Sequence, residues 1–543
     1  MKYNCYRLFI FFYDILYSSK GGEEGMTQKE YEQACEIEKL KKEIQQYKKE
    51  NDTLKKTLKI QSKQLKNANE LIEDLQKENK TKAYNVAMRK NSLLRDEIKA
   101  LKEEISCKET TIQNLSVQLK KDSTNSSKPS STDNIYKKKV HIVSSRKAGG
   151  KNGGQWNHKG TTFSKEEVEK LIKDKKVEHK IKHIGNKKSG KYKSKYIVDV
   201  KVVTTVTEYR FYEEENGKYA IPKQMEPEVQ YGSTSKALMC YLTTEMMAPL
   251  NKTRSFFKQI TNNIIKLSEG TIVNTQRVLD KRLTPVVNEI KERLIKAKVM
   301  HVDETGVRIN GELNWLHTCC SKDFVYYEVN EKRGKDAIDT IGILAYFVNI
   351  LVHDHWKPYY KETHMTHAEC NAHILRYLKG ILIITEQKDV EELIKLFVEM
   401  NETKKEAILQ NCTKLDEEYI EEFSNRYDKI LKSWRKDLNK RMSKVKETKM
   451  FTDELNLLNR LEEYKENHLL FIKDFDVPFD NNSAERSLRM IKGKTKISGG
   501  FRTEEGAKAF AKIRSFISTC KLRTENIIEE LIKIFEGNEY EFV

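Results

Sequence analysis

The sequence predicts an α/β fold, and the prediction rests on three observations between residues 298 and 354. Strand-like runs rich in β-branched and aromatic residues follow one another closely. Asn310-Gly311 is typical of a tight turn between the first two runs. An amphipathic helical segment then leads into the unbroken apolar run Ile350-Leu351-Val352, which is typical of a strand buried on both faces. In order, the strand, strand, strand, helix and strand are expected at 298–307, 312–321, 324–329, 335–347 and 349–354.

Three carboxylates lie within this framework. Asp303 falls in the first strand and Asp354 at the tip of the fourth, which is the ribonuclease H-like arrangement. Glu485 follows the turn and helix N-cap residues 480–483, so it falls in a first helical turn. Any one of these acids alone is more often a capping or surface residue. Together they suit two divalent ions that promote in-line displacement at a phosphodiester, and magnesium prefers such oxygen ligands.

Long motifs strengthen this interpretation. In chain order they are VQYGSTSKAL, LSEGTIVNTQ, HVDETGVRINGELNWLH, EKRGKDAIDTIGIL, VHDHWKPYYKETHMTHAECNAHILRYL and FDNNSAERSLRMIKGKTKISGGFRTEEGAKAFAKIRSFIST. From about Pro227 to the C-terminus, the chain resembles the insertion-sequence-66 family of bacterial DDE transposases. The resemblance implies that Asp303, Asp354 and Glu485 are the catalytic, metal-binding triad of a domain at 298–500. It also implies two Mg²⁺ or Mn²⁺ ions and a helical insertion at about 366–470.

The activity expected from the resemblance is cleavage of the element ends and transfer of the 3′ hydroxyl to target DNA. Element-end and target DNA are then the partners, with element-encoded accessory proteins as further ones. The alternative is a catalytically inactive, coiled-coil DNA-binding remnant of a transposase. Intact acids at the three triad positions favour the active enzyme.

His367, Cys370, His373 and Arg376 recur at three-residue intervals, so on a helix they would share roughly one face. The segment resembles the family's Cys-x-x-His element. Three interpretations stay open: zinc binding by the two histidines and the cysteine, an accessory active-site role for Cys370, His373 and Arg376, or ordinary helix packing. Glu369 departs from the family, whose members usually have an apolar residue there.

Cysteine usage excludes a four-thiolate zinc site, because none occurs between Cys107 and Cys240, where relatives carry two Cys-x-x-Cys pairs. We therefore expect no structural zinc and a small β-rich domain at 161–226, in the degenerate zinc-finger position, with strands at 191–212. A basic loop in this domain is a further candidate DNA contact: Lys187, Lys188, Lys191, Lys193 and Lys195. The nine cysteines show no pairing pattern, which favours a reduced, intracellular protein. The family resemblance further implies a cytoplasmic, nucleoid-associated bacterial protein.

The charge balance agrees with a DNA partner, since 100 Lys and Arg against 81 Asp and Glu give a formal charge of +19. A helical DNA-binding region is expected at 227–297, where the segments 251–260 and 271–283 form either a helix-turn-helix-like pair or an ordinary packing unit. Six cations follow Glu485 and are interpreted as DNA contacts or, alternatively, as a solvated helix face. They are Arg486, Arg489, Lys492, Lys494, Lys496 and Arg502.

Residues 28–121 show the apolar a/d spacing of a coiled coil, with Asn51 and Asn79 at a positions and a break near 82–94. This predicts a homodimer or higher oligomer, the alternative being one long helix on the protein body. A basic flexible linker (122–160) follows, and a helical tail (501–543) ends the chain. The apolar run of ten residues in 1–27 is too short to span a membrane, and we expect this extension to be non-native or disordered, with Met26 as the start.

Overall fold

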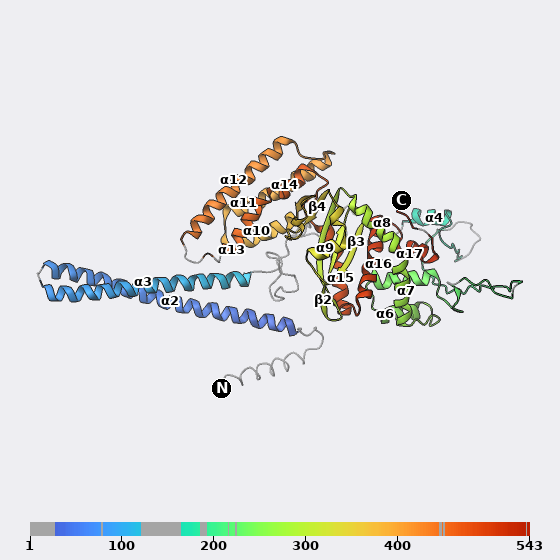
Figure 1. The fold of residues 1–543 in the computed structure, drawn as a ribbon, viewed down its shortest axis with the longest axis horizontal. Helices are drawn as coiled ribbons and strands as arrows, with labels where there is room; N and C mark the ends of the chain where they lie inside the picture. The colour runs from blue at the N-terminus through green and yellow to red at the C-terminus, as the bar shows by residue number, and fades with distance from the viewer. Residues whose placement is uncertain are drawn as a thin grey trace, which may run out of the picture. The chain divides into compact units, whose positions relative to one another are not determined.

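The computed structural model describes residues 28–77, 80–120, 164–184, 193–215, 217–222, 225–444, 448, 451–538 and 540–542 (Figure 1). The chain divides into two compact units. The first takes its residues from Met1–Lys137, Ile290–Gly306 and Asn314–Met490, and the second from Lys138–Glu289, Val307–Leu313 and Ile491–Val543. The expected extension at 1–27, the linker at 122–160 and the lysines at 187–191 lie outside the described residues.

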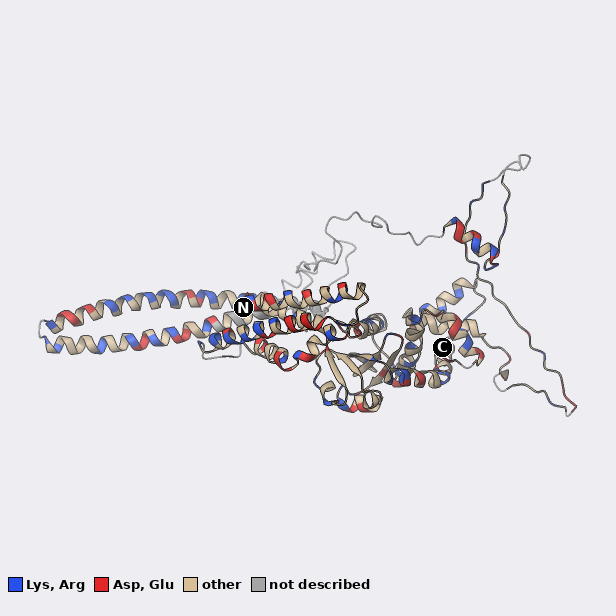
Figure 2. Cartoon of the chain, turned by 90° about the horizontal axis from the view of Figure 1, so that it is seen from above, with Lys and Arg blue, Asp and Glu red and all other residues tan. Residues whose placement is uncertain are grey.

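Two long helices, α2 (Gln28–Lys77) and α3 (Thr81–Lys120), lie side by side and antiparallel (Figure 1). The Lys108 ammonium lies 2.6 Å from the Glu50 carboxylate on the facing helix, and Lys and Arg alternate with Asp and Glu along both helices (Figure 2). Four residues of the expected seam are buried: Ile44, Asn51, Ile98 and Ile105. Leu94, which lies in the expected break, is buried as well.

The other helix of the same chain covers this seam. The seam therefore does not require a second chain, and the homodimer stays a prediction. α2 ends at Lys77 and α3 begins at Thr81, which is earlier than the break expected near 82–94. Asn79 lies outside the described residues.

A five-stranded mixed sheet forms the centre of the chain, in the order β3-β2-β1-β4-β5. The strands are β1 (Val299–Ile309), β2 (Glu312–Cys320), β3 (Val325–Asn330), β4 (Ile350–His353) and β5 (Thr366–Glu369). Asn310 and Gly311 both have positive φ, 49° and 84°, as the predicted tight turn between β1 and β2 requires. β4 lies parallel to both β1 and β5, so the acid-bearing strands are neighbours.

The predicted crossover helix is shorter than expected. α9 (Lys335–Ile341) ends at Gly342, whose φ of 72° is the left-handed conformation that closes many helices, and a 3-10 turn, η4 (Leu344–Tyr346), precedes β4. A second short turn, η5 (Tyr359–Lys361), separates β4 from β5.

The described part of the insertion expected at about 366–470 is mainly helical after its start. Residues 366–369, expected in a helix, form β5, because pairing with β4 satisfies their backbone groups. The following helices are packed around a core that includes Phe397, Tyr427 and Trp434. They are α10 (Asn371–Thr385), α11 (Lys388–Leu409), α12 (Glu417–Met442), α13 (Thr452–Glu463) and α14 (Lys465–Lys473). The chain then continues into α15 (Asn482–Ser498).

Helices dominate the described part of the second unit: α4 (Lys165–Lys173), α5 (Ser233–Thr244), α6 (Leu250–Ile260), α7 (Glu269–Arg282), α16 (Glu504–Leu522) and α17 (Ile527–Glu536). α8 (Thr284–Ile295) begins in this unit and ends in the first. The expected helix pair at 251–260 and 271–283 corresponds to α6 and α7, and Ser268 caps α7 by accepting the Thr271 N–H at 3.0 Å.

The β-rich domain expected at 161–226 is wrong for the described residues. Residues 193–212 are extended without strand pairing, and the bridge Glu213–Tyr219 is the one described pairing in this region. Ile197 and Val206 are more than 90% exposed. Alternating β-branched residues predict a strand, but a strand also needs a hydrogen-bonding partner, and the described chain supplies none here.

No helix in the described parts of the chain combines the length and apolar character that crossing a bilayer demands.

Candidate active and metal site

Asp303 and Asp354 lie at matching positions of neighbouring parallel strands. β1 and β4 pair Val299 with Ile350 and His301 with Val352. Extending this register by two residues sets Asp303 opposite Asp354, which directly follows β4. The carboxylate of Asp303 accepts the Glu304 N–H at 2.9 Å, and that of Asp354 accepts the Trp356 N–H at 3.3 Å. The register therefore brings the two acids to one place in the sheet, and their role as metal ligands stays a prediction.

Glu485 comes from the first turn of α15, as predicted. The preceding residue that fixes this helix is Asn481, which is buried. Its side chain lies 2.8 Å from His301 Nδ1 and donates to the Val302 carbonyl at 2.8 Å, while its N–H donates to Cys370 Sγ at 3.1 Å. One amide side chain and its backbone therefore attach the start of α15 to β1 and to the N-terminus of α10.

Electrostatics show that the three acids are close enough to influence one another. Burial, and then the negative charges of Glu304, Asp354 and Glu485, raise the pKa of Asp303 to about 8. A carboxyl group with this pKa holds a proton near neutral pH unless a cation replaces it. The group of acids is therefore unfavourable when fully ionised and favourable around positive charge.

Glu304 is a fourth acid beside this group and, unlike the other three, is fully buried; sequence reasoning missed it. Its carboxylate accepts the Arg333 Nε–H at 2.8 Å and the Tyr359 hydroxyl at 2.7 Å. Burial raises its pKa despite these two partners. The Arg333 guanidinium also lies over the rings of Trp315 and Trp356, at 4.8 and 4.6 Å. Glu304 adjoins Asp303 in the sequence, but only the fold shows that the positive charge of Arg333 neutralises Glu304.

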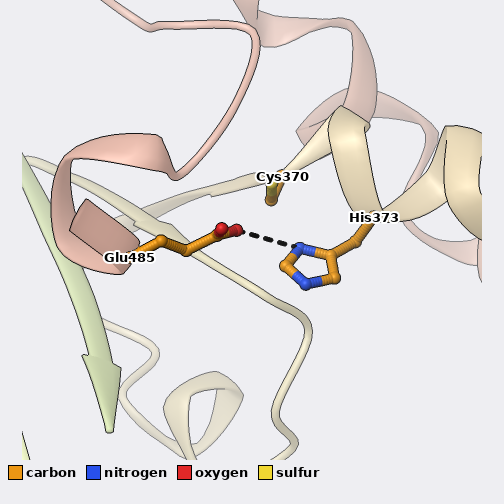
Figure 3. A group of neighbouring side chains, drawn as sticks. All are labelled: Cys370, His373 and Glu485. Atoms are coloured by element: carbon orange, nitrogen blue, oxygen red, sulfur yellow. Dashed lines mark ion pairs between the residues drawn. The ribbon is translucent and has the colours of Figure 1, made fainter. Parts of the chain in front are cut away.

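Cys370, His373 and Glu485 form the second part of the site (Figure 3). Their candidate ligand atoms all lie within 4.8 Å of one another, and His373 Nδ1 is 3.8 Å from Glu485 Oε1. That nitrogen is buried and has no hydrogen-bond partner among the described residues. Burial, followed by the charge of Arg376, lowers the pKa of His373, while burial raises that of the Cys370 thiol to about 12.

The common helical face expected for His367, Cys370, His373 and Arg376 is wrong at its first member. His367 lies in β5, Cys370 is the N-cap of α10, and only His373 and Arg376 are helical. His367 Nδ1 lies 3.1 Å from His353 Nε2, and its other ring nitrogen lies 3.0 Å from the Glu362 carbonyl. Zinc binding by His367, Cys370 and His373 together is therefore not supported, and Glu485 replaces His367 in the cluster.

Five of the six cations expected to contact DNA are exposed: Arg486, Arg489, Lys492, Lys496 and Arg502. The sixth, Lys494, lies over the rings of Phe501 and Phe510, with its ammonium 5.5 and 4.9 Å from their centres. Burial lowers its pKa. The aromatic contacts indicate that Lys494 packs into the protein instead of extending toward a ligand.

The donor set fits divalent ions. Asp303, Asp354 and Glu485 offer carboxylate oxygens, the donors that magnesium and manganese prefer, and the raised pKa of Asp303 shows that a positive charge is favoured there. Cys370, His373 and Glu485 offer sulfur, nitrogen and oxygen, a combination that suits a softer ion, but burial keeps the thiol protonated.

These features define a mixed α/β protein with a cluster of partly or fully buried carboxylates beside its central parallel strands. The model of the transposase IS66 family matches residues 228–509, more than half of the chain. The chain belongs to the IS66 transposase family. No curated protein matches it.

Proposed function

We propose that the protein is a DDE transposase with a ribonuclease H-like core. In this proposal Asp303, Asp354 and Glu485 hold two Mg²⁺ or Mn²⁺ ions. The observation that carries the proposal is the placement of Asp303 and Asp354 on adjacent parallel strands, with Glu485 close enough to add to the charge on Asp303. The sheet order, with an antiparallel meander followed by parallel strands, supports the fold assignment.

The expected reaction is hydrolysis at the element ends followed by attack of the freed 3′ hydroxyl on target DNA. The bound ions would supply activation of the attacking oxygen and stabilisation of the leaving oxygen. The three acids bind and orient these ions. Arg333 holds Glu304 and thereby limits the negative charge beside Asp303.

Cys370, His373 and Arg376 have accessory roles in this proposal. The neutral His373 ring, which lies 3.8 Å from Glu485, presents a hydrogen-bonding nitrogen to the scissile phosphate or to Glu485. Arg376, on the same helix, adds a positive charge that favours phosphate. The buried Cys370 thiol accepts the Asn481 N–H and so supports the position of α15.

DNA binding is assigned to the exposed cations of α15 and to Arg502, with α6 and α7 as a second candidate surface. Arg489, Lys492 and Lys496 follow Glu485 at helical spacing, so they lie on roughly the same face of α15 as the acid. The α2–α3 pair is assigned to an antiparallel coiled coil that promotes self-association through its uncovered side.

A strand-transfer assay with the element's terminal inverted repeats and a supercoiled target tests the proposal. The wild-type protein should cut and join in Mg²⁺, and Asp354→Asn should bind the ends without cutting them. Binding without cutting by the wild type would instead support the inactive, coiled-coil DNA-binding remnant.

A further inference from the structure

Glu369 is a fully buried carboxylate that the proposed chemistry does not use. It ends β5 directly beside β4, where the register pairs it with His353, the residue before Asp354. None of its side chain is exposed. A buried charge of this kind costs free energy unless it is paired and hydrogen-bonded, so the partners of Glu369 indicate its role.

The two oxygens of Glu369 bind two different parts of the first unit. One oxygen accepts short hydrogen bonds from His355 Nδ1 and the Tyr360 hydroxyl, both in the segment that follows Asp354. The other accepts from Arg460 Nε at 2.8 Å and lies 3.0 Å from His468 Nε2, on α13 and α14 of the helical insertion. Although burial acts to raise it, these partners hold the pKa of Glu369 well below its ordinary value.

The backbone at His355 explains why such a support is needed. His355 has a φ of 73°, a left-handed conformation that a residue with a Cβ seldom adopts. This turn sets the direction of the Asp354 side chain, because the Trp356 N–H is bonded to the Asp354 carboxylate within it. The bond from His355 to Glu369 holds the ring, and with it the turn, against the buried end of β5.

We propose that Glu369 is a positioning residue that connects the helical insertion to Asp354 through His355. The insertion supplies Arg460 and His468 to fix the carboxylate, and the carboxylate fixes the turn that aims Asp354. Correct packing of α13 and α14 is thereby a condition for tight metal binding. This inference rests on the proposed function, since it takes Asp354 to be a metal ligand.

The first test is Mn²⁺ binding to the full-length protein, measured by calorimetry without DNA. Glu369→Gln should weaken Mn²⁺ affinity by about tenfold or more, the usual effect of losing a residue that orients a metal ligand. The matched control is Glu454→Gln. Glu454 is equally buried on α13, where it pairs with Arg441 and Trp434 and has no contact with the Asp354 turn among the described residues. It should bind Mn²⁺ like the wild type.

A second pair of variants remains informative if Glu369→Gln does not fold. His355→Ala removes the ring and keeps a Cβ at positive φ, whereas His355→Gly removes the ring but adopts that φ without strain. If the turn is what matters, the glycine variant should bind Mn²⁺ several-fold more tightly than the alanine variant. Equal affinities in these two variants, or wild-type affinity in Glu369→Gln, would overturn the inference.

The proposed function fails in a distinguishable way. If Asp354→Asn binds Mn²⁺ and joins DNA ends normally, Asp354 is not a ligand, and both proposals are lost. If Asp354→Asn is defective while Glu369→Gln and both His355 variants match the wild type, only the role of Glu369 is lost.

Discussion

The β1–β4 register places Asp303 opposite Asp354, and their carboxylates accept the backbone N–H groups of Glu304 and Trp356. Parallel neighbours present their side chains at the same level, so two acids in this relationship repel each other at close range. The pKa of Asp303 is high because the side chain is buried and because Glu304, Asp354 and Glu485 carry negative charge nearby.

Glu485→Gln should abolish Mg²⁺-dependent cleavage and strand transfer while leaving end binding intact. Losing one charged metal ligand raises the activation free energy by about 4 kcal/mol, which slows the reaction about a thousandfold. Glu504→Gln and Glu505→Gln are matched controls, because both acids lie exposed at the start of α16. Normal strand transfer by Glu485→Gln, together with an inactive control, would identify a different third acid.

Metal binding should release a proton from Asp303. Below pH 8 the buried carboxyl holds a proton that the ion must displace, so metal affinity should rise as the pH increases from about 6 to about 8. Calorimetry in two buffers with different ionisation enthalpies counts the released protons. Asp303→Asn should show no such release, and a pH-independent affinity in the wild type would contradict the prediction.

Stability of the metal-free protein should depend on pH in a defined direction. The pKa of Asp303 is raised in the folded state, so the native protein binds more protons than the unfolded chain between about pH 4 and pH 8, and this contribution falls as the pH rises. Asp303→Asn should remove that part of the decline, which is measured as unfolding midpoints across this pH range. Equal pH profiles for the two proteins would show that the carboxyl is not buried among like charges.

The purified protein should contain no stoichiometric zinc. The Cys370 thiol is protonated at neutral pH because burial raises its pKa, and among the described residues only His373 and Glu485 join it as candidate ligands. Elemental analysis provides the measurement. If one zinc per chain were found, Cys370→Ser should remove it, whereas Cys412→Ser, which alters an exposed cysteine, should not.

Single replacement of an exposed cation such as Arg489 by Ala should weaken DNA binding similarly for all sequences and reduce the salt slope by about one. Lys494→Ala serves as the comparison, because this lysine is packed on Phe501 and Phe510. It should leave the salt slope unchanged and lower thermal stability. A slope change for Lys494→Ala equal to that for Arg489→Ala would place Lys494 at the DNA.

Much of the site could be predicted from the sequence, because its signals are local. The Asn-Gly turn, the apolar run of β4 and the capping residues before α15 each determine a short stretch of structure, and these stretches place Asp303, Asp354 and Glu485. β5 was harder to predict. Its four residues are too short to show a period of two, and the spacing of His367, Cys370 and His373 matches a helix that begins only after Cys370.

The ion pairs and hydrogen bonds between side chains distant in the sequence could not be predicted. Glu369 is interpretable only with Arg460, which lies 91 positions later in the chain, and Glu304 only with Arg333 and Tyr359. A single sequence shows that these charged residues are present but does not show which of them form pairs in the fold. The exposed segment 193–212 shows the opposite case, in which a clear strand pattern lacks a described partner.

The hydrogen bonds of Asn481 determine when Glu485 reaches its position beside Asp303 and Asp354. Because one buried residue joins the start of α15 to β1 and α10, the third acid reaches its place when the chain folds and not when DNA arrives. Under the proposed function, the three acids are then in place before DNA binds. Free energy from DNA contacts is then available for bending and aligning the ends, since none is needed to order the carboxylates.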